Sequence, residues 1–320
     1  GTGPMKLTRQ KRSAVLSPIP PEDRGLPPQE DWKQRRRKLQ LTAESGDQAV
    51  ADFNAGKVDF VLGGQFQDFP RLDASGVSRG AIRFDPVMGL FGLTVTHDDG
   101  FLGEPENREA LAMAIDRDAL GGAIGVGGWA QTTRVANPGS GDDNGSVGER
   151  WPGRSLAERR SEASARVARW KAGHSLTPLR IALPAGPGAD ALFRQLAADY
   201  KAIGLEAQRV GENAAADLRL IDKVARYARL GWFLNQLSCD NAPPACSPAA
   251  DRLATQALAE TDPAKRMDLL AQAEAQLTMT NSYIPFGVPI RWSLVSGQAS
   301  GFAINRWAMH PLMQLAMKPK

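Results

Sequence analysis

The sequence predicts an α/β fold arranged in two domains or lobes, and three observations support this. Helical and strand patterns alternate between residues 156 and 210, as expected where helices cover a sheet. A length of 320 residues favours two domains over one. Hydrophobic residues make up 42% of the chain and charged residues 23%, as in ordinary soluble globular proteins, and no apolar run is long enough to cross a bilayer.

The first hundred residues predict strands and one helix. Residues 1–40 contain proline pairs and many charges, a composition typical of loops with short strands. Leu39 and Leu41 alternate with polar neighbours, which indicates a strand. A helix that begins near Ser45 ends at Gly56, a typical C-terminal stop. The strands expected in this part of the chain are 37–45, Val58–Leu62 and 89–97.

The segment "REALAMAIDRDAL", which ends at residue 120, predicts one amphipathic helix with Asn107 as its N-cap. We expect Arg108 and Arg117 to be solvated. The residues expected to share the buried face of this helix are Leu111, Ala114, Ile115 and Ala119.

The second half of the chain predicts four helices and several strands. Two helices open with a capping residue followed by proline, at Ser247–Pro248 and at Asp262–Pro263. The expected helices are 156–173, 189–204, 247–260 and 261–279, and the expected strand segments are 179–184, 205–210 and 283–297.

Two cysteines, Cys239 and Cys246, flank the insert "DNAPPA". The insert allows the chain to turn back on itself, so a local disulfide is expected, which favours an oxidising compartment such as a periplasm. Two thiols without a nearby histidine do not suit zinc. The alternative is a pair of reduced, buried thiols.

The residues offer no positive case for catalysis, so we expect a protein that is not an enzyme. Nucleophilic catalysis needs a base beside the nucleophile, and no Gly-x-Ser-x-Gly elbow is present. The alternative is an α/β hydrolase or transferase of unknown substrate. That alternative requires two of the three histidines to converge with a Ser, Asp or Glu; they are His97, His174 and His310.

We expect no cofactor, no metal and no nucleic-acid partner. The glycine-rich residues 121–128 do not match Gly-x-Gly-x-x-Gly and follow no strand, which excludes a nucleotide-binding loop. Residues 137–148 lack the spacing of a calcium loop. The basic run 32–38 has no second basic stripe interleaved with aromatic residues, so a solvated strand end explains it better than nucleic-acid binding.

Several segments, taken in order, resemble the peptide/nickel/opine class of extracellular solute-binding proteins of bacterial ABC importers. Each segment alone is a capped helix or a turn, but five in the same order are much harder to obtain by chance. The segments are "GTGPMKL" (1–7), "AVADFNAGKVDFVLG" (49–63), "ENREALAMAIDRDAL" (106–120), "RQLAADYKAIGLEAQ" (194–208) and the helix pair that ends in "YIPF" (249–286).

The resemblance implies a two-lobed, type II periplasmic-binding-protein fold in which the first lobe is incomplete. The first lobe would comprise 1–95 plus 291–320, and the second 96–290. It implies that a peptide-like or other small solute binds in a cleft between the lobes and passes to an ABC permease at the inner membrane. Members are longer before the Gly-Thr-Gly-Pro turn, so a missing N-terminal segment or chain is expected. Export to the periplasm is expected, with a signal sequence that is not in this chain.

The resemblance also places ligand-binding candidates on loops at strand ends. Each candidate has an alternative: Phe66 and Trp292 as core residues, and Lys223 and Arg226 as solvated charges. The full set of candidates is Gln65, Phe66, Asp222, Lys223, Arg226, Tyr227 and Trp292.

One departure from the family concerns the ligand. Peptide-binding members carry a Gly-Trp pair followed by an Asp that resembles a counter-ion for the peptide's amino group. Here Ile221 and Asp222 replace Gly-Trp, and no Asp follows before Cys239. A buried amino group without a carboxylate carries a large desolvation cost, which disfavours an unmodified peptide as the ligand.

Overall fold

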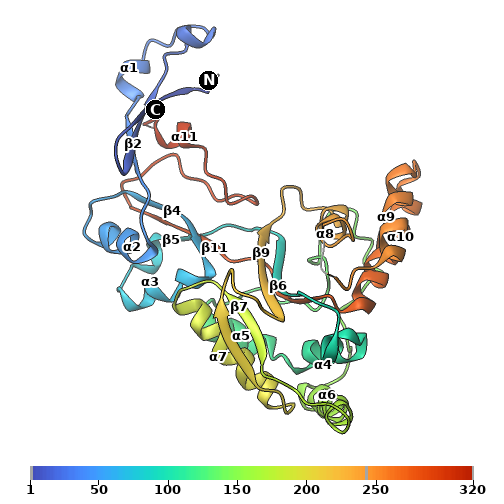
Figure 1. Cartoon of the computed structure of the whole chain (residues 1–320). Helices are drawn as coiled ribbons and strands as arrows, with labels where there is room; N and C mark the ends of the chain where they lie inside the picture. Colours follow the sequence, from blue (N-terminus) through green and yellow to red (C-terminus); the bar gives the residue numbers. More distant parts are fainter. Residues whose placement is uncertain (1–2, 242–243, 319–320) are drawn as a thin grey trace. The chain divides into compact units, whose positions relative to one another are not determined.

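The computed structural model describes residues 3–241 and 244–318, and the chain divides into two compact units (Figure 1). Unit 1 consists of Gly1–Pro86 and Ile290–Lys320, and unit 2 of Val87–Pro289. The chain therefore passes between the units twice. The first two residues of the expected Gly-Thr-Gly-Pro turn lie outside the described residues, as do Ala242 and Pro243 between the cysteines.

The first boundary between the units differs from the expected one at residue 95. Strand β6 (Gly89–Val95), assigned above to the first lobe, pairs with β9 (Leu218–Val224) and β10 (Tyr283–Gly287) in the sheet of unit 2. The chain therefore leaves unit 1 after Pro86. Pairing decides which unit a strand joins, and these partners lie more than a hundred residues away along the chain.

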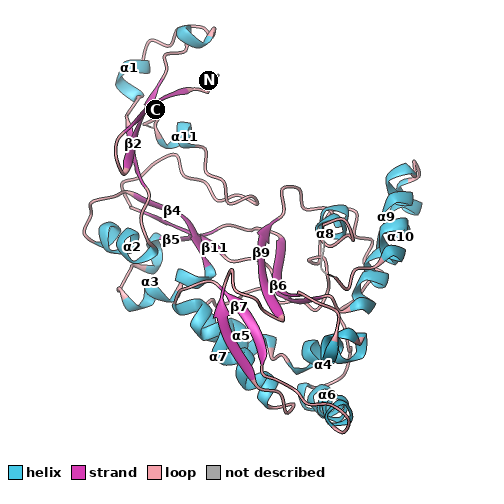
Figure 2. Cartoon of the chain, viewed as in Figure 1, coloured by secondary structure: helices cyan, strands magenta, loops and turns pink. Residues whose placement is uncertain are grey.

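Unit 1 contains two three-stranded antiparallel sheets (Figure 2). One has the order β1-β2-β3, with bounds Met5–Arg9, Ser13–Pro18 and Leu39–Thr42. The other has the order β4-β11-β5, with bounds Phe60–Gln65, Arg291–Val295 and Ile82–Phe84. The central strand β11 therefore comes from the C-terminal part of the chain.

The helices of unit 1 are short. The expected helix near residue 45 is confirmed as α2 (Gly46–Asn54), because the Ser45 side chain accepts a hydrogen bond from Gln48 N and Gly56 has a positive φ. The first part of the basic run forms helix α1 (Trp32–Arg35), in which Trp32 is buried. Arg36 and Lys38 are exposed just before β3, so the expected solvated strand end holds for this part of the run. The remaining helical elements are η1 (Glu22–Arg24), η2 (Phe66–Asp68), α3 (Pro70–Ala74), η3 (Arg79–Ala81) and α11 (Leu312–Leu315).

Unit 2 is built on a five-stranded mixed sheet in the order β10-β6-β9-β7-β8. Strands β7 (Leu179–Leu183) and β8 (Ala207–Gly211) are parallel neighbours joined through helix α7 (Pro187–Lys201), the expected α/β crossover. The α/β prediction is confirmed. The apolar face predicted for α7 is buried and comprises Leu192, Leu196 and Tyr200.

The prediction of a single helix over 107–120 is wrong. The chain forms α4 (Pro105–Ala114) and α5 (Arg117–Ile124), and Asp116 caps α5 by accepting a hydrogen bond from Ala119 N at 3.0 Å. Asn107 lies inside α4, whose N-cap is Glu104. Asp and Asn side chains compete with helical hydrogen bonds, so Asp116 favours a new helix start over continuation.

Arg108 and Arg117 are buried, contrary to the expectation that they are solvated. Arg108 Nε donates to Thr280 O at 2.7 Å and Nη1 to Gly103 O at 3.1 Å. Arg117 Nε donates to Pro285 O at 3.0 Å, and burial lowers the pKa of Arg117 to about 10. Both side chains thus link the helical segment by hydrogen bonds to backbone that is distant in the sequence, at Thr280 and Pro285.

The turn between α4 and α5 is also held by a buried carboxylate. Asp199 Oδ2 accepts a hydrogen bond from Asp116 N at 3.1 Å, and its Oδ1 pairs with Arg160 Nη2 at 2.6 Å. Burial raises the pKa of Asp199 to about 6. Arg160 belongs to α6 (Leu156–Lys171), so this contact joins three helices.

Three helices, α8 (Leu230–Gln236), α9 (Pro248–Ala259) and α10 (Pro263–Thr280), and the short helix η4 (Gly100–Gly103) complete the described helices of unit 2. The capping residues predicted for α9 and α10, Ser247 and Asp262, are confirmed. Their apolar faces meet β6 in a core that includes Leu90, Phe233, Leu270 and Leu277. The expected disulfide between Cys239 and Cys246 is present just before α9.

A buried ionic network fixes the loop between α5 and α6 against α10. Arg134 donates to both carboxylate oxygens of Asp143 at 3.0 and 3.1 Å, and to those of Glu274 at 3.2 and 2.8 Å. Ala136 N donates to Glu274 Oε1 at 3.2 Å. The side chains of all three charged residues are less than a tenth exposed, so each charge depends on the others.

We predict that Arg134→Met destabilises the protein by about 3–5 kcal/mol, because it leaves two buried carboxylates without their cation. Urea denaturation followed by circular dichroism measures the loss. Arg229→Met is the matched control, since Arg229 is exposed in its pair with Asp142 and its loss should cost less than about 1 kcal/mol. Equal losses in the two variants would contradict the prediction.

We predict that Asp199→Asn changes how stability depends on pH. The pKa of Asp199 is raised from 3.8 to about 6 on folding, so the folded state holds its proton more tightly than the unfolded state. Ionisation of Asp199 therefore lowers the unfolding free energy as pH rises from about 4 to about 6, by at most about 3 kcal/mol. The asparagine variant lacks this loss. Urea denaturation of both proteins at about pH 4 and about pH 6 measures the unfolding free energies. Parallel pH dependences of the unfolding free energy in the wild type and the variant would refute the prediction.

Candidate functional site

The candidates in unit 1 lie beside the second crossover between the units. Gln65 is the last residue of β4 instead of following the strand, because β4 runs from Phe60 to Gln65 and not from Val58 to Leu62. Gln65 pairs with Arg291, the second residue after the chain re-enters unit 1. Trp292 Nε1 donates to Gln65 O at 2.8 Å, so the structure brings these two candidates together.

Phe66 and Trp292 are core residues of unit 1. Phe66 is fully buried and Trp292 is 2% exposed. The Trp292 ring packs directly over Gly64 and meets Phe69 edge-on at 6.5 Å between ring centres. This burial favours the core role that the sequence left open for both aromatic residues. Gln65, which is half-buried, remains the candidate of unit 1 with polar atoms near the surface.

The candidates in unit 2 lie beside the first crossover. Asp222 pairs with Phe91 and Lys223 with Leu90 in the ladder between β9 and β6. Arg226 and Tyr227 follow the end of β9 and are exposed, with Tyr227 52% accessible. The strand β9 itself was not predicted from the sequence, because "LRLIDKV" has polar residues on both faces.

Sequence reasoning also missed Tyr283, which lies near Asp222. Tyr283 is buried in β10, and its pKa is raised by burial and additionally by the charge of Asp222. The Tyr283 hydroxyl also interacts with the backbone of Phe91, the ladder partner of Asp222. Asp222 of β9 and Tyr283 of β10 thus lie on the two strands that flank β6. The sequence signal for Tyr283 is the "YIPF" segment.

His310 forms a buried cluster with Asp85 and Ser293 in unit 1. His310 Nε2 lies 3.1 Å from Asp85 Oδ2 and 3.4 Å from Ser293 Oγ. A catalytic triad requires the carboxylate and the hydroxyl on opposite ring nitrogens, whereas here both meet the same nitrogen. Asp85 also accepts a hydrogen bond from Asn305 N at 2.9 Å. The cluster holds the segment after β11 in place.

The other two histidines have separate partners in unit 2. His97 Nε2 lies 3.1 Å from Asp217 Oδ1, and Asp217 also pairs with Arg180 at 2.9 Å. His174 stacks on Trp170 with ring centres 4.0 Å apart. No two histidines converge among the described residues, so the arrangement required by the hydrolase or transferase alternative does not form.

Across 3–241 and 244–318, no three His, Cys, Asp or Glu side chains gather closely enough to hold a metal ion. No helix in that part of the chain has the length and apolar content to span a membrane.

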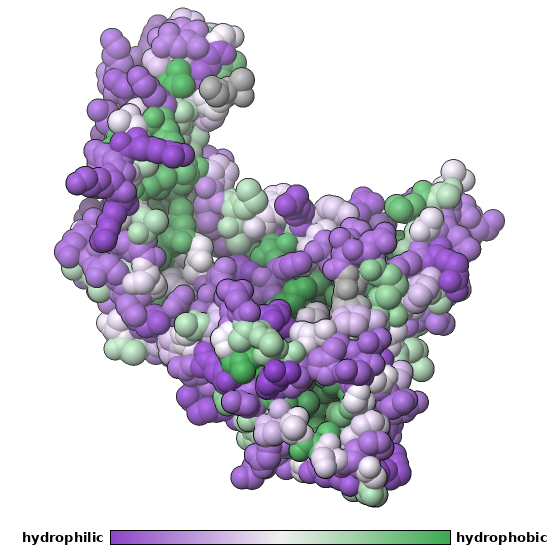
Figure 3. All heavy atoms as spheres, in the orientation of Figure 1, coloured by the Kyte–Doolittle hydropathy of each residue, from purple (hydrophilic) through white to green (hydrophobic). Residues whose placement is uncertain are grey.

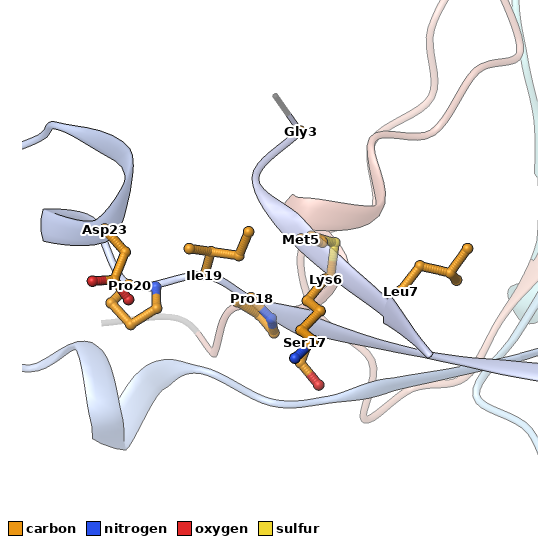
Figure 4. A pocket seen from close by; sticks show the side chains of 9 residues that line it. All are labelled: Gly3, Met5, Lys6, Leu7, Ser17, Pro18, Ile19, Pro20 and Asp23. Atoms are coloured by element: carbon orange, nitrogen blue, oxygen red, sulfur yellow. The ribbon is translucent and has the colours of Figure 1, made fainter. Parts of the chain in front are cut away.

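Two of the hollows on the described surface of unit 1 have similar volumes. One, of about 690 Å³, lies between β3 and β4, and hydrophobic atoms appear at the surface over this part of unit 1 (Figure 3). The other, of about 600 Å³, lies over the β1–β2 hairpin (Figure 4). Its walls include Met5 and Leu7 of β1 and Pro18 and Ile19 at the end of β2. Neither hollow contains any of the ligand-binding candidates.

Comparison with known proteins relates this arrangement to solved structures. No protein-family model matches the chain, and no curated protein matches its sequence. The structure matches Haemophilus influenzae OppA in complex with the peptide RPPGFSPFR, with a TM-score of 0.78 and 17% identity over 98% of this chain and 64% of OppA. It also matches the murein tripeptide binding protein MppA of Escherichia coli, with a TM-score of 0.78 and 16% identity over 98% of this chain and 64% of MppA.

A third match is NikA of Brucella suis in complex with Fe(III)-EDTA, with a TM-score of 0.76 and 15% identity over 100% of this chain and 68% of NikA. The chain has the fold of these binding proteins. The expectation of a two-lobed type II periplasmic-binding-protein fold is therefore confirmed. This chain spans about 64% of the length of OppA and of MppA.

We predict that Gly64→Ala destabilises unit 1 by about 3 kcal/mol, because the new methyl group would overlap the Trp292 ring in a filled core. Gly122→Ala is the matched control. Gly122 lies within α5 with open space around it, so alanine there should stabilise the protein by about 0.5–1 kcal/mol. Urea denaturation with tryptophan fluorescence measures both changes, and a neutral Gly64→Ala would show that Trp292 is free to move.

Proposed function

We propose that this protein is the solute-binding component of a bacterial ABC importer. The observation that carries the proposal is the match of nearly the whole chain to OppA, MppA and NikA, whose structures are those of binding proteins. The protein would bind a small solute in the periplasm and deliver it to a permease in the inner membrane. The Cys239–Cys246 disulfide supports an oxidising compartment.

We propose that the solute contacts residues beside the two crossovers. Gln65 of unit 1 lies next to the second crossover, and four residues of unit 2 lie next to the first. Binding proteins of this architecture close by rotation about the crossover segments, which absorb the change in backbone angles. The four residues of unit 2 are Asp222, Lys223, Arg226 and Tyr227.

The charges of these residues favour a solute with an anionic group over an unmodified peptide. Lys223 and Arg226 are exposed cations at the end of β9. Asp222, the one acidic candidate, lies in the β9–β6 ladder within the sheet, and no Asp lies between Lys223 and Cys239. A carboxylate or similar anion on the solute would pair with the cations, whereas a buried peptide amino group would lack a counter-ion.

Native mass spectrometry of the protein purified from its own host tests the proposal, because a bound solute appears as an added mass. A thermal-shift series then compares trialanine, N-acetyl-trialanine and N-acetyl-trialanine amide. A solute bound at a hundred times its Kd adds about 2.7 kcal/mol of stability. We expect the acetylated carboxylate to stabilise more than the other two probes.

We predict that Lys223→Gln weakens binding of the carboxylate probe about tenfold, which corresponds to the loss of about 1.4 kcal/mol from one charge-assisted contact. Lys201→Gln is the control, because Lys201 is an exposed lysine at the end of α7. Isothermal titration calorimetry measures both affinities. Equal affinities in the two variants would show that Lys223 does not contact the solute. The absence of any bound solute would contradict the proposed function.

A further inference from the structure

A hollow of about 530 Å³ on unit 2 lies where helices α5 and α6 begin. Its volume is within the range of sites that hold small molecules. None of the ligand-binding candidates named above lines it. Four arginines do line it; they are Arg117, Arg150, Arg154 and Arg159.

Two of these four arginines are paired with carboxylates and two are not. Arg150 and Arg154 each form an ion pair at 2.7 Å with a glutamate on a neighbouring helix. Arg117 donates instead to two backbone carbonyl oxygens, and Arg159 Nη1 donates to Met113 O at 3.2 Å. Among the described residues, no carboxylate forms an ion pair with Arg117 or with Arg159. Their positive charges are therefore left without a direct counter-ion.

Arg117 is the most deeply buried of the four and retains a free donor. It is 7% exposed, and its Nη2 atom has no hydrogen-bond partner in the described part of the chain. Its pKa is lowered first by burial and then by the charges of Arg159 and Arg150, whereas the opposing effect of Glu149 is smaller. These three charged residues also line the hollow, which places the Arg117 guanidinium in its wall. An anion there would accept the free N–H groups and offset the repulsion between the arginines.

Trp151 holds two of the guanidinium groups beside the hollow. Arg150 Cζ lies 4.3 Å and Arg159 Cζ 5.6 Å from the centre of the Trp151 ring. The indole Nε1 donates to Glu109 Oε1 at 3.1 Å, which fixes the orientation of the ring. A ring that stacks on two cations keeps both in place near Arg117, so little side-chain ordering is required when an anion binds.

The carboxylates that line the hollow are already engaged within unit 2. Glu149 Oε1 accepts a hydrogen bond from Thr132 Oγ1 at 2.6 Å, and its Oε2 accepts one from Thr133 N at 2.6 Å. Asp116 caps α5, and Asp118 accepts a hydrogen bond from a glutamine side chain. These contacts hold the acidic groups on other partners and leave the free donors of the arginines to a ligand from solution.

We propose that this hollow, the arginine pocket formed by the four arginines and Trp151, binds a small solute through a carboxylate or phosphate group held by Arg117 and Arg159. A guanidinium presents its donors as a planar fork that matches two oxygen atoms of either group. The proposal concerns a second site, within unit 2, and does not depend on the proposed function.

An anion titration followed by nuclear magnetic resonance tests the proposal, because the Nε–H signals of individual arginines report where an anion binds. The probes are sodium phosphate and sodium succinate near neutral pH, and sodium chloride at matched ionic strength measures general screening. We expect saturable shifts of the Arg117 and Arg159 signals with an oxyanion and not with chloride. Phosphate affinity about tenfold above that of succinate would identify a phosphorylated solute, and the reverse order a carboxylate.

Variants of the two unpaired arginines measure their contribution. Arg159→Gln should weaken oxyanion binding about tenfold, because it removes one charge-assisted contact while leaving Arg117 in place. Arg117→Gln should weaken it at least as much, and the amide signals of the unit 2 sheet show whether that variant folds. Arg159→Gln decides the test if it does not. Arg252→Gln, at an exposed arginine of α9, and Lys223→Gln, at the crossover candidate, should retain the wild-type affinity.

Three outcomes would overturn the proposal. The first is that neither phosphate nor succinate shifts the Arg117 and Arg159 signals more than chloride does. The second is equal oxyanion affinity in Arg159→Gln and Arg252→Gln, which would show that the anion binds elsewhere. The third is a loss of affinity in Lys223→Gln alone, which would place the anion at the crossover candidates and support the proposed function instead.

Discussion

The double crossover is the constraint on which the rest of the structure depends. The chain leaves unit 1 after Pro86 and returns after Pro289, and within each unit the two strands that flank the crossovers pair with each other. In unit 1, β5 pairs with β11, and Asp85 N continues the ladder by donating to Arg291 O at 3.1 Å. In unit 2, β6 pairs with β10. Each crossover therefore begins and ends in a hydrogen-bonded ladder. Of the ligand-binding candidates, Trp292 belongs to the β5–β11 ladder, and Gln65, Asp222 and Lys223 lie in neighbouring ladders of the same sheets.

Beside its apolar core, unit 2 is held together by buried arginines. Arg134 is paired with two carboxylates, whereas Arg117 and Arg108 donate to backbone carbonyls. A guanidinium group keeps its charge even when burial lowers its pKa, and its planar donors reach several acceptors at once. Such contacts connect the helices to the loops and to β10 at defined positions. They also explain why removing one partner is expected to cost more than removing an exposed ion pair.

The arrangement of titratable groups fits binding better than catalysis. The three histidines have separate surroundings, and the closest approach to a triad, His310 with Asp85 and Ser293, is buried and has both partners on one ring nitrogen. Among the ligand-binding candidates, the accessible residues Lys223, Arg226 and Tyr227 lie beside the first crossover. Binding proteins need such groups to recognise a solute and to respond to closure, and they need no activated nucleophile.

The sequence alone determined many of the local elements, and their order indicated the fold. Caps such as Ser45, Ser247 and Asp262 act on backbone groups two or three residues away, and the cysteine pair closes a short loop, so both are visible in a short window. The tertiary structure decided the rest. Arg117 is buried because its guanidinium meets Pro285, 168 residues away, and β6 belongs to unit 2 because β9 and β10 pair with it. Burial and pairing depend on contacts between distant segments, and no local pattern encodes them.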